Sequence, residues 1–304
     1  MIMDLYQKIT PLWARLLVYR IMARNYYRQY RNDLLTLYKD KDTREKYKEE
    51  LTEITAKQAV YMINLPYKAE YIPSSVKVHK DRVAGMYYVL VDGKKLYYPS
   101  GWSRAQIKFY HNSLLTEMDE RSPHSYTSTS FNVPDGASLI DLGGAEGIFT
   151  LKNIERIEKA YVFECDTLWE EPLKKTFEKW SGKVEIVPMF IGDEIKPGFT
   201  TLDAFIKDKR IADIPVFVKC DIEGAEETFL RGASESLASM NIELAICLYH
   251  RKDAEEKIGN LLKDKVYYCE YSKGYLFPVG FEKNISFPCF RRGVMRCRIQ
   301  NKAE

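Results

Sequence analysis

Strand-like and helix-like segments alternate along the chain from residue 138 to its end. Short apolar runs predict buried strands at 138–142, 160–164, 184–191, 215–221, 243–249, 266–271 and 293–299. Helical patterns occupy 147–158, 168–180, 201–209, 225–239 and 253–263. Alternation of this kind predicts an α/β fold whose mostly parallel sheet is covered by helices on both faces. The last two short strands predict an antiparallel terminal hairpin.

The junction between the first of these strands and its helix is rich in glycine. The sequence SLIDLGGAEG at 138–147 places Asp141 at the end of an apolar run, followed by Gly143, Gly144 and Gly147. A tight turn from strand to helix needs residues that tolerate positive φ and close contact. The start of a helix also presents free N–H groups. This segment therefore predicts a loop that binds a nucleotide-type cofactor.

The spacing of the glycines separates two kinds of cofactor. The dinucleotide fingerprint is G-x-G-x-x-G, and Leu142 occupies its first position here. Asp141, Gly143 and Gly147 instead form D-x-G-x-x-x-G, which resembles motif I of the class I S-adenosylmethionine methyltransferases. In those enzymes the loop packs against the amino-acid part of the cofactor. Glu164 ends the next predicted strand, where a carboxylate can accept both ribose hydroxyls; the alternative is a solvated acid.

Composition excludes several classes of protein. The chain has 304 residues, 45% of them apolar, which predicts one large or two modest globular domains. A net charge of +3 with many charges of both signs gives no nucleic-acid footprint. No apolar run reaches the length of a membrane span. Arg15 and Arg20 interrupt the apolar N-terminal segment, which argues against a secretory signal and for a cytoplasmic location.

The six cysteines form no C-x-x-C pair, which argues against a zinc site of the usual spacing. Cys165, Cys220 and Cys247 fall in predicted buried strands, where they are expected to be small core residues in a reducing compartment.

Two regions precede the alternating part, and we predict domains at 1–65, 66–133 and 134–304. The first is helical, and a set of arginines recurs along one of its faces. They are Arg20, Arg24, Arg28 and Arg31. Residues 10–31 could therefore contact an anionic membrane, although a helix packed on the domain with solvated arginines is favoured. The second region is mixed, and Asp92-Gly93 between two strand-like runs predicts a hairpin.

Charged and titratable residues gather where the predicted strands end, the edge at which open α/β sheets bind ligands. Asp221 and Glu223 follow one strand, and His250 ends the next. We expect His250 to be a general base, with Glu223 or Asp221 orienting the acceptor or acting as base. The three could hold a metal ion, but we predict none. Lys219 lies inside an apolar strand, so it is either paired with a carboxylate or functional.

Several blocks together resemble the FkbM-type methyltransferases over about residues 120–300. They are DLGGAEGIFTL, YVFECD, TTLDAF, KCDIEGAEETFLRGA and ICLYHR, with SPHSY at 122–126 ahead of them. The resemblance implies a Rossmann-like class I methyltransferase sheet with an N-terminal extension. It also implies S-adenosylmethionine-dependent O-methylation of a hydroxyl on a sugar, or on a polysaccharide or glycolipid building block. We keep a non-catalytic binding module and an NAD(P)-dependent oxidoreductase as alternatives, and the oligomeric state stays open.

The resemblance also implies roles for individual positions. The predicted cofactor-binding residues are Asp141, Gly143, Gly144, Ala145, Gly147, Glu164, Cys165 and Asp221. His124 and Tyr126 are weaker candidates for the acceptor wall. Many relatives have alanine at the position of Gly144, and proline is frequent at that of Cys165.

Overall fold

The computed structural model describes residues 40–46, 48, 66–263, 267–276 and 290–299. Most of the predicted N-terminal helical region, including residues 10–31 and their arginines, lies outside these ranges. Within it, the short helix α3 (Lys41–Lys46) has no buried residue. In the described part of the chain, no helix combines the length and apolar character needed to cross a membrane.

The chain divides into two compact units. The larger comprises Tyr67–Gly274 and Arg292–Glu304, and the smaller comprises Met1–Pro66 and Tyr275–Arg291. In the smaller unit, Leu276 and Arg291 form an isolated antiparallel bridge. The predicted boundary at 65/66 lies next to the division at Pro66, whereas the predicted boundary at 133/134 lies inside the larger unit.

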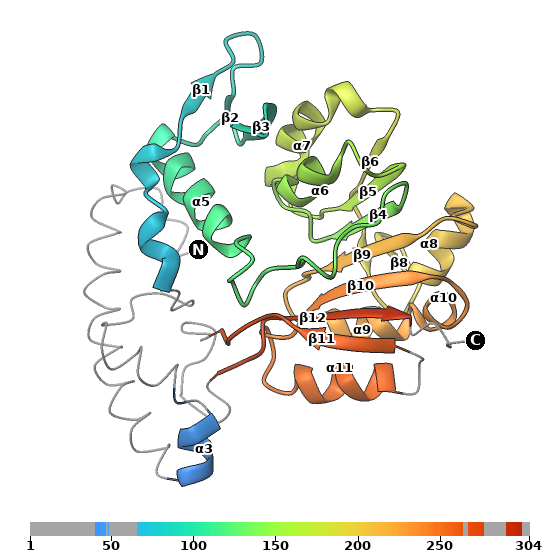
Figure 1. Cartoon of the computed structure of the whole chain (residues 1–304). Helices are drawn as coiled ribbons and strands as arrows, with labels where there is room; N and C mark the ends of the chain where they lie inside the picture. Colours follow the sequence, from blue (N-terminus) through green and yellow to red (C-terminus); the bar gives the residue numbers. More distant parts are fainter. Residues whose placement is uncertain (1–39, 47, 49–65, 264–266, 277–289, 300–304) are drawn as a thin grey trace, which may run out of the picture. The chain divides into compact units, whose positions relative to one another are not determined.

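A seven-stranded sheet forms the centre of the larger unit (Figure 1). Its strands are β4 (Ser138–Leu142), β5 (Lys159–Phe163), β6 (Val184–Val187), β9 (Val216–Cys220), β10 (Ile242–Cys247), β11 (Tyr267–Tyr271) and β12 (Val294–Ile299). They are ordered β11-β12-β10-β9-β4-β5-β6. The strands from β10 to β6 in this order are parallel, and β12 runs antiparallel to both β10 and β11. This arrangement confirms the predicted Rossmann-like class I methyltransferase sheet with its antiparallel terminal hairpin.

The helices follow the predicted pattern with local differences. They are α6 (Ile148–Asn153), η3 (Thr167–Trp169), α7 (Glu170–Thr176), η4 (Glu178–Trp180), α8 (Leu202–Lys209), α9 (Glu226–Arg231), α10 (Ser234–Ser239) and α11 (Ala254–Lys263). The single helix predicted at 225–239 is wrong, since α9 ends and α10 begins around Gly232. A Cβ at Gly232 would lie 1.9 Å from the carbonyl oxygen of Gly192, so the chain breaks where a distant backbone approaches it. The strand predicted at 184–191 is also two elements, β6 and β7 (Phe190–Ile191), and β7 pairs with β8 (Phe199–Thr200).

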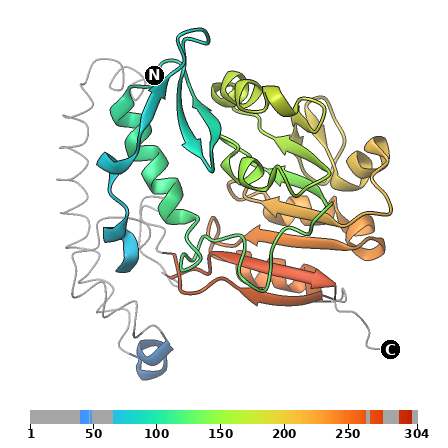
Figure 2. The same ribbon diagram turned by 45° about the horizontal axis from the view of Figure 1, so that its top comes forward.

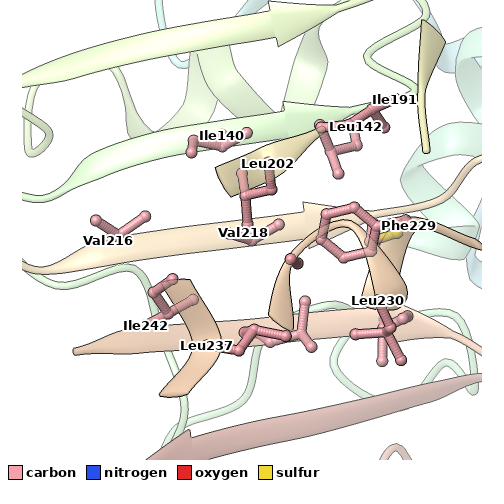
Figure 3. Packing of buried hydrophobic residues seen from close by; sticks show 14 of the residues in the cluster. Ile140, Leu142, Ile191, Leu202, Val216, Val218, Phe229, Leu230, Leu237 and Ile242 are labelled. Carbon is pink, nitrogen blue, oxygen red and sulfur yellow. The ribbon is translucent and has the colours of Figure 1, made fainter. Parts of the chain in front are cut away.

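Alternate residues of the central strands form the hydrophobic core on one face of the sheet. Ile140 and Leu142 of β4, with Val216 and Val218 of β9, pack against helical side chains such as Phe229 (Figure 3). Because side chains alternate between faces along a strand, the intervening residues point to the opposite face. The register of β4 and β9 places Asp141 beside Lys219 on that face.

The region before the sheet supplies a small antiparallel sheet and a helix. Its elements are η1 (Pro66–Glu70), η2 (Pro73–Ser75), β1 (Val78–Lys80), β2 (Tyr87–Val91), β3 (Lys94–Tyr98) and α5 (Arg104–Glu117). Asp92 and Gly93 have φ of 47° and 78° between the paired strands β2 and β3, which confirms the predicted hairpin. The backbone N–H of Tyr97 in β3 donates to Thr176 Oγ1 in α7, so the hairpin packs on a helix of the methyltransferase sheet (Figure 2).

Candidate active site

The glycine-rich loop after β4 packs tightly against the end of β9. Gly143 has φ of +71°, and a Cβ there would lie 1.9 Å from the backbone oxygen of Asp221. Gly147 has φ of +82°, and its Cβ would lie 2.8 Å from side-chain atoms of Leu173 and Phe177. Both positions therefore need glycine for conformation and for space, as the sequence pattern predicts.

Hydrogen bonds within the protein occupy the first N–H groups of this loop. Gly143 and Gly144 both donate to the carbonyl oxygen of Phe163 at 3.0 Å. The N–H of Ala145 donates to Glu164 Oε2 at 2.7 Å. A pyrophosphate-binding loop presents its N–H groups to the ligand, so this arrangement disfavours a dinucleotide cofactor.

A buried ion pair lies beneath the loop. Asp141 is completely buried, and its Oδ1 lies 3.0 Å from Lys219 Nζ. The Lys219 ammonium also donates to the carbonyl oxygens of Leu142 at 3.2 Å and Gly143 at 2.5 Å. Thr150 Oγ1 donates to the other carboxylate oxygen of Asp141 at 2.7 Å. The structure thus supports the paired interpretation of Lys219. Asp141 is connected to the loop through Lys219, which it holds against the carbonyl oxygens of Leu142 and Gly143. Direct contact of Asp141 with a cofactor stays a prediction.

The electrostatics of the pair follow from this geometry. Burial disfavours the ammonium of Lys219, but the charge of Asp141 and the hydrogen bond to it outweigh that effect and raise the Lys219 pKa. The Lys219 ammonium is therefore charged across the physiological range.

The predicted ribose-binding acid lies beside the same loop. Each oxygen of the Glu164 carboxylate accepts one backbone N–H, from Ala145 and from Asp166, both at 2.7 Å. A carboxylate oxygen has more than one lone pair, so both oxygens can still accept ribose hydroxyls. The two backbone bonds hold the carboxylate in one orientation, and its contact with a ribose stays a prediction.

Two neighbouring positions differ from the sequence-based expectation. Cys165 follows β5 and is only half-buried, so its predicted place in a buried strand is wrong. Burial raises the pKa of its thiol to about 11, which keeps it neutral at pH 7. At Gly144 an added Cβ would lie 2.3 Å from Val162 Cγ1, so alanine requires that side chain to move.

Asp221 lies at the centre of a group of polar aromatic side chains, which we name the Asp221 cluster: His124, Tyr126, Asp221, Tyr249 and His250. The hydroxyl of Tyr126 donates to Asp221 Oδ2 at 2.6 Å, and that of Tyr249 donates to Oδ1 at 3.2 Å. The Nε2 atoms of His124 and His250 lie 3.3 and 3.4 Å from the carboxylate. Sequence reasoning identified all of these positions except Tyr249.

Opposite charges within the Asp221 cluster shift the pKa values of its carboxylate and of its two histidines. Burial opposes ionisation of Asp221, but the hydrogen bond and charge of His124 outweigh it and lower the Asp221 pKa. Burial likewise opposes protonation of His124, yet Asp221 raises its pKa. The pKa of His250 is also raised, because the hydrogen bond with Glu226 and the charge of Asp221 exceed the cost of burial.

His250 is oriented by a carboxylate that sequence reasoning missed in this role. Its Nδ1 lies 2.8 Å from Oε1 of Glu226, and only 2% of the Glu226 side chain is exposed. Glu226 occupies the first turn of α9, a position that by itself indicates only an interaction with the helix N-terminus. Glu223, predicted to orient the acceptor or to act as base, has an 80% exposed side chain, and its Oε2 lies 3.6 Å from His250 Nε2. Glu226 therefore orients the ring, while Glu223 lies at the solvent side of it.

The terminal strands position the segment that carries His124 and Tyr126. Arg296 of β12 donates from Nη2 to the carbonyl oxygen of Ser125 at 2.6 Å, and Ser272 Oγ donates to that of Pro123. A Cβ at Gly293 would lie 1.7 Å from the same Pro123 oxygen. The antiparallel hairpin thus fixes the backbone of the segment that carries two members of the Asp221 cluster.

A disulfide joins Cys269 of β11 to Cys297, the residue opposite it in β12. Disulfides are typical of oxidising compartments, and the predicted cytoplasmic location stays a prediction.

Asp221, Glu226 and His250 offer ligand atoms within 4.8 Å of one another, a spacing that could hold a metal ion. Hydrogen bonds already engage both carboxylates: Glu226 Oε1, for example, also accepts from the N–H groups of Ile222 and Gly224. An ion would have to displace these contacts, so the metal-free site stays our prediction.

Comparison with known proteins supports the family resemblance. Residues 162–273 match the model of the methyltransferase FkbM domain, which confirms the resemblance over that range. No curated protein matches the chain.

Three solved structures illustrate the likeness. A methyltransferase FkbM from Methylobacillus flagellatus KT is 17% identical, with 64% of this chain and 53% of that chain covered and a TM-score of 0.45. Precorrin-6y C5,15-methyltransferase from Geobacter metallireducens GS-15 is 13% identical, with 61% and 86% covered and a TM-score of 0.38. TrmK from M. capricolum, in complex with S-adenosylhomocysteine, is 12% identical, with 57% and 67% covered and a TM-score of 0.35.

The match spans about half the length of the FkbM methyltransferase structure. Because all three TM-scores lie below 0.5, the fold assignment rests on the strand order itself.

Proposed function

We propose, from the FkbM methyltransferase domain at residues 162–273 and the geometry of the Asp221 cluster, that the protein is an S-adenosylmethionine-dependent O-methyltransferase. The acceptor is a hydroxyl of a sugar, or of a polysaccharide or glycolipid building block. The observation that carries the proposal is the convergence of two histidines and two tyrosines on one carboxylate at the carboxyl ends of β9 and β10.

The residues around the loop suit this cofactor. The backbone of Gly143–Gly147 would face its amino-acid part, and the Glu164 carboxylate would accept the ribose hydroxyls. The N–H groups that a pyrophosphate would need are engaged within the protein, at Gly143, Gly144 and Ala145. S-adenosylmethionine supplies a methyl group on a sulfonium, which is already activated for displacement.

His250 acts as the general base. Glu226 accepts the hydrogen bond from Nδ1–H, so the lone pair of the neutral ring is on Nε2. Nε2 takes the proton of the acceptor hydroxyl as the new oxygen–carbon bond forms. The imidazolium that results lies 3.4 Å from Asp221 and 2.8 Å from Glu226, which stabilise its charge. Such a base contributes about 10²–10⁴-fold to the rate.

Tyr126 and His124 form the wall beside the acceptor. Their rings lie 5.1 Å apart, and both are fixed on Asp221 through their polar atoms. Orientation of the acceptor oxygen against the methyl group supplies most of the remaining acceleration, because the reaction is an in-line displacement.

Calorimetric titration with S-adenosylhomocysteine, with NADH as the control ligand, tests the cofactor. We expect binding of the first alone, at micromolar concentration. Binding of neither ligand, or of NADH alone, contradicts the proposal.

Mass spectrometry after incubation with S-adenosylmethionine and panels of sugars, oligosaccharides and glycolipids tests the acceptor. A His250→Asn variant should bind S-adenosylhomocysteine normally and lose transfer by about 10²–10⁴-fold. Glu223→Gln is the control, because its exposed carboxylate should affect transfer much less. Equal loss in both variants contradicts the assignment of the base.

A further inference from the structure

The glycine-rich loop contains a buried acid that the proposed mechanism does not use. Glu146 lies between Ala145 and Gly147, and only 3% of it is exposed. Its neighbours Ala145 and Gly147 have φ of 44° and 82°, so the backbone on either side of Glu146 is in the left-handed region. Burial of a carboxyl group is costly unless a partner satisfies it.

That partner comes from the accessory region. The hydroxyl of Tyr110 in α5 donates to Glu146 Oε2 at 2.9 Å. The ring of Tyr110 packs with two tryptophan rings that also contact each other: its centroid lies 5.0 Å from that of Trp102 and 5.7 Å from that of Trp169. The carboxyl group is thus kept at one position in the loop by a rigid aromatic contact from outside the methyltransferase sheet.

The charge of Glu146 depends on its surroundings. Burial raises its pKa to about 7, the hydrogen bond from Tyr110 and the charge of Lys219 oppose the rise, and the charge of Asp141 adds to it. Tyr98 also interacts electrostatically with Glu146 and is itself neutral, because burial raises its pKa. Near neutral pH the carboxyl group is therefore partly ionised.

We propose that Glu146 makes this loop bind S-adenosylmethionine, whose sulfur is positively charged, more tightly than S-adenosylhomocysteine, whose sulfur is neutral. The inference rests on the proposed function, which places S-adenosylmethionine against Gly143–Gly147. On transfer, the methyl–sulfur bond breaks and its electron pair stays on sulfur, the methyl–oxygen bond forms, and the acceptor proton goes to His250. The sulfur loses its positive charge in that step, so the Glu146 carboxylate attracts the substrate form of the cofactor and not the product.

Three variants separate this effect from a structural one. Glu146→Gln removes the charge and keeps the shape and the acceptor for Tyr110. Tyr110→Phe keeps the charge and removes the hydrogen bond that lowers the Glu146 pKa. Glu155→Gln makes the same change of charge at an exposed position beyond α6 and serves as the matched control.

The test is calorimetric titration of the full chain with S-adenosylmethionine and with S-adenosylhomocysteine, at about pH 6 and about pH 8. In the wild type and in Glu155→Gln, we expect the ratio of the two affinities to rise with pH by up to roughly tenfold, as a charge–charge interaction in a partly polar site predicts. In Glu146→Gln the ratio should be lower and independent of pH. In Tyr110→Phe the rise should occur at higher pH.

The outcomes distinguish the two proposals. If the wild type binds neither ligand, the proposed function fails. If it binds both and Glu146→Gln shows the wild-type ratio and pH dependence, the selection by Glu146 is refuted and the proposed function stands. Should Glu146→Gln not fold, an unchanged pH dependence in Tyr110→Phe refutes it instead.

Discussion

Removal of the ammonium beneath the cofactor loop should destabilise the protein strongly. In Lys219→Met, Asp141 would keep its place in a completely buried environment, where Thr150 is its remaining side-chain partner among the described residues. Loss of one member of a buried ion pair costs about 3–5 kcal/mol, because the other charge is left uncompensated. The Lys219 pKa is raised above its ordinary value of 10.5, so this stabilisation is fully present below pH 10.5 and is lost only at higher pH.

The assay is urea unfolding of the wild type, Lys219→Met, Asp141→Asn and the double variant, followed by circular dichroism. We expect the double variant to be more stable than the sum of the single effects predicts, since neither charge remains unpaired. A cost below about 1 kcal/mol for Lys219→Met, or additive effects, would refute the importance of the pair. Titration with S-adenosylhomocysteine provides a second readout, because Lys219 also holds the carbonyl oxygens of Leu142 and Gly143.

Two further predictions concern the loop and the base. Gly143→Ala should destabilise the fold and abolish cofactor binding, because its Cβ would lie 1.9 Å from the Asp221 carbonyl oxygen. The control is Gly136→Ala: φ there is +75° and an added Cβ meets no atom within 4 Å, so this variant should lose only about 1 kcal/mol in urea unfolding and bind the cofactor normally. Similar losses of stability in both variants would contradict the packing argument. Glu226→Gln should lower the pKa of His250, because it removes the charged partner that raises that pKa. The acidic limb of the kcat–pH profile should therefore move to lower pH by about one pH unit. If the limb does not move, another group is the base.

Local patterns in the sequence predicted most of the sheet. Apolar runs identified β4, β5, β9 and β10 to within about two residues, because a strand buried on both faces needs a continuous apolar stretch. The break between α9 and α10 was not predictable in this way. The break occurs at Gly232, because the carbonyl oxygen of Gly192, forty residues earlier in the chain, lies against it and leaves no room for a side chain.

The sequence by itself determined which chemical groups reach the carboxyl edge of the sheet: Asp221, Glu223 and His250 were all placed there by the ends of apolar runs. Only the tertiary structure decided how these groups are paired. It joins Tyr126 to Asp221, 95 residues away, and assigns Glu226 and not Glu223 to the Nδ1 atom of His250.

The tertiary structure also decided the pairing of the charged groups around the glycine-rich loop. Lys219 forms an ion pair with Asp141 beneath the loop, and Tyr110 donates a hydrogen bond to Glu146 within it. The physical reason is that a side chain's neighbours along the chain control its secondary structure, whereas its hydrogen-bond partners depend on strand register and on the packing of distant elements, which no local periodicity specifies.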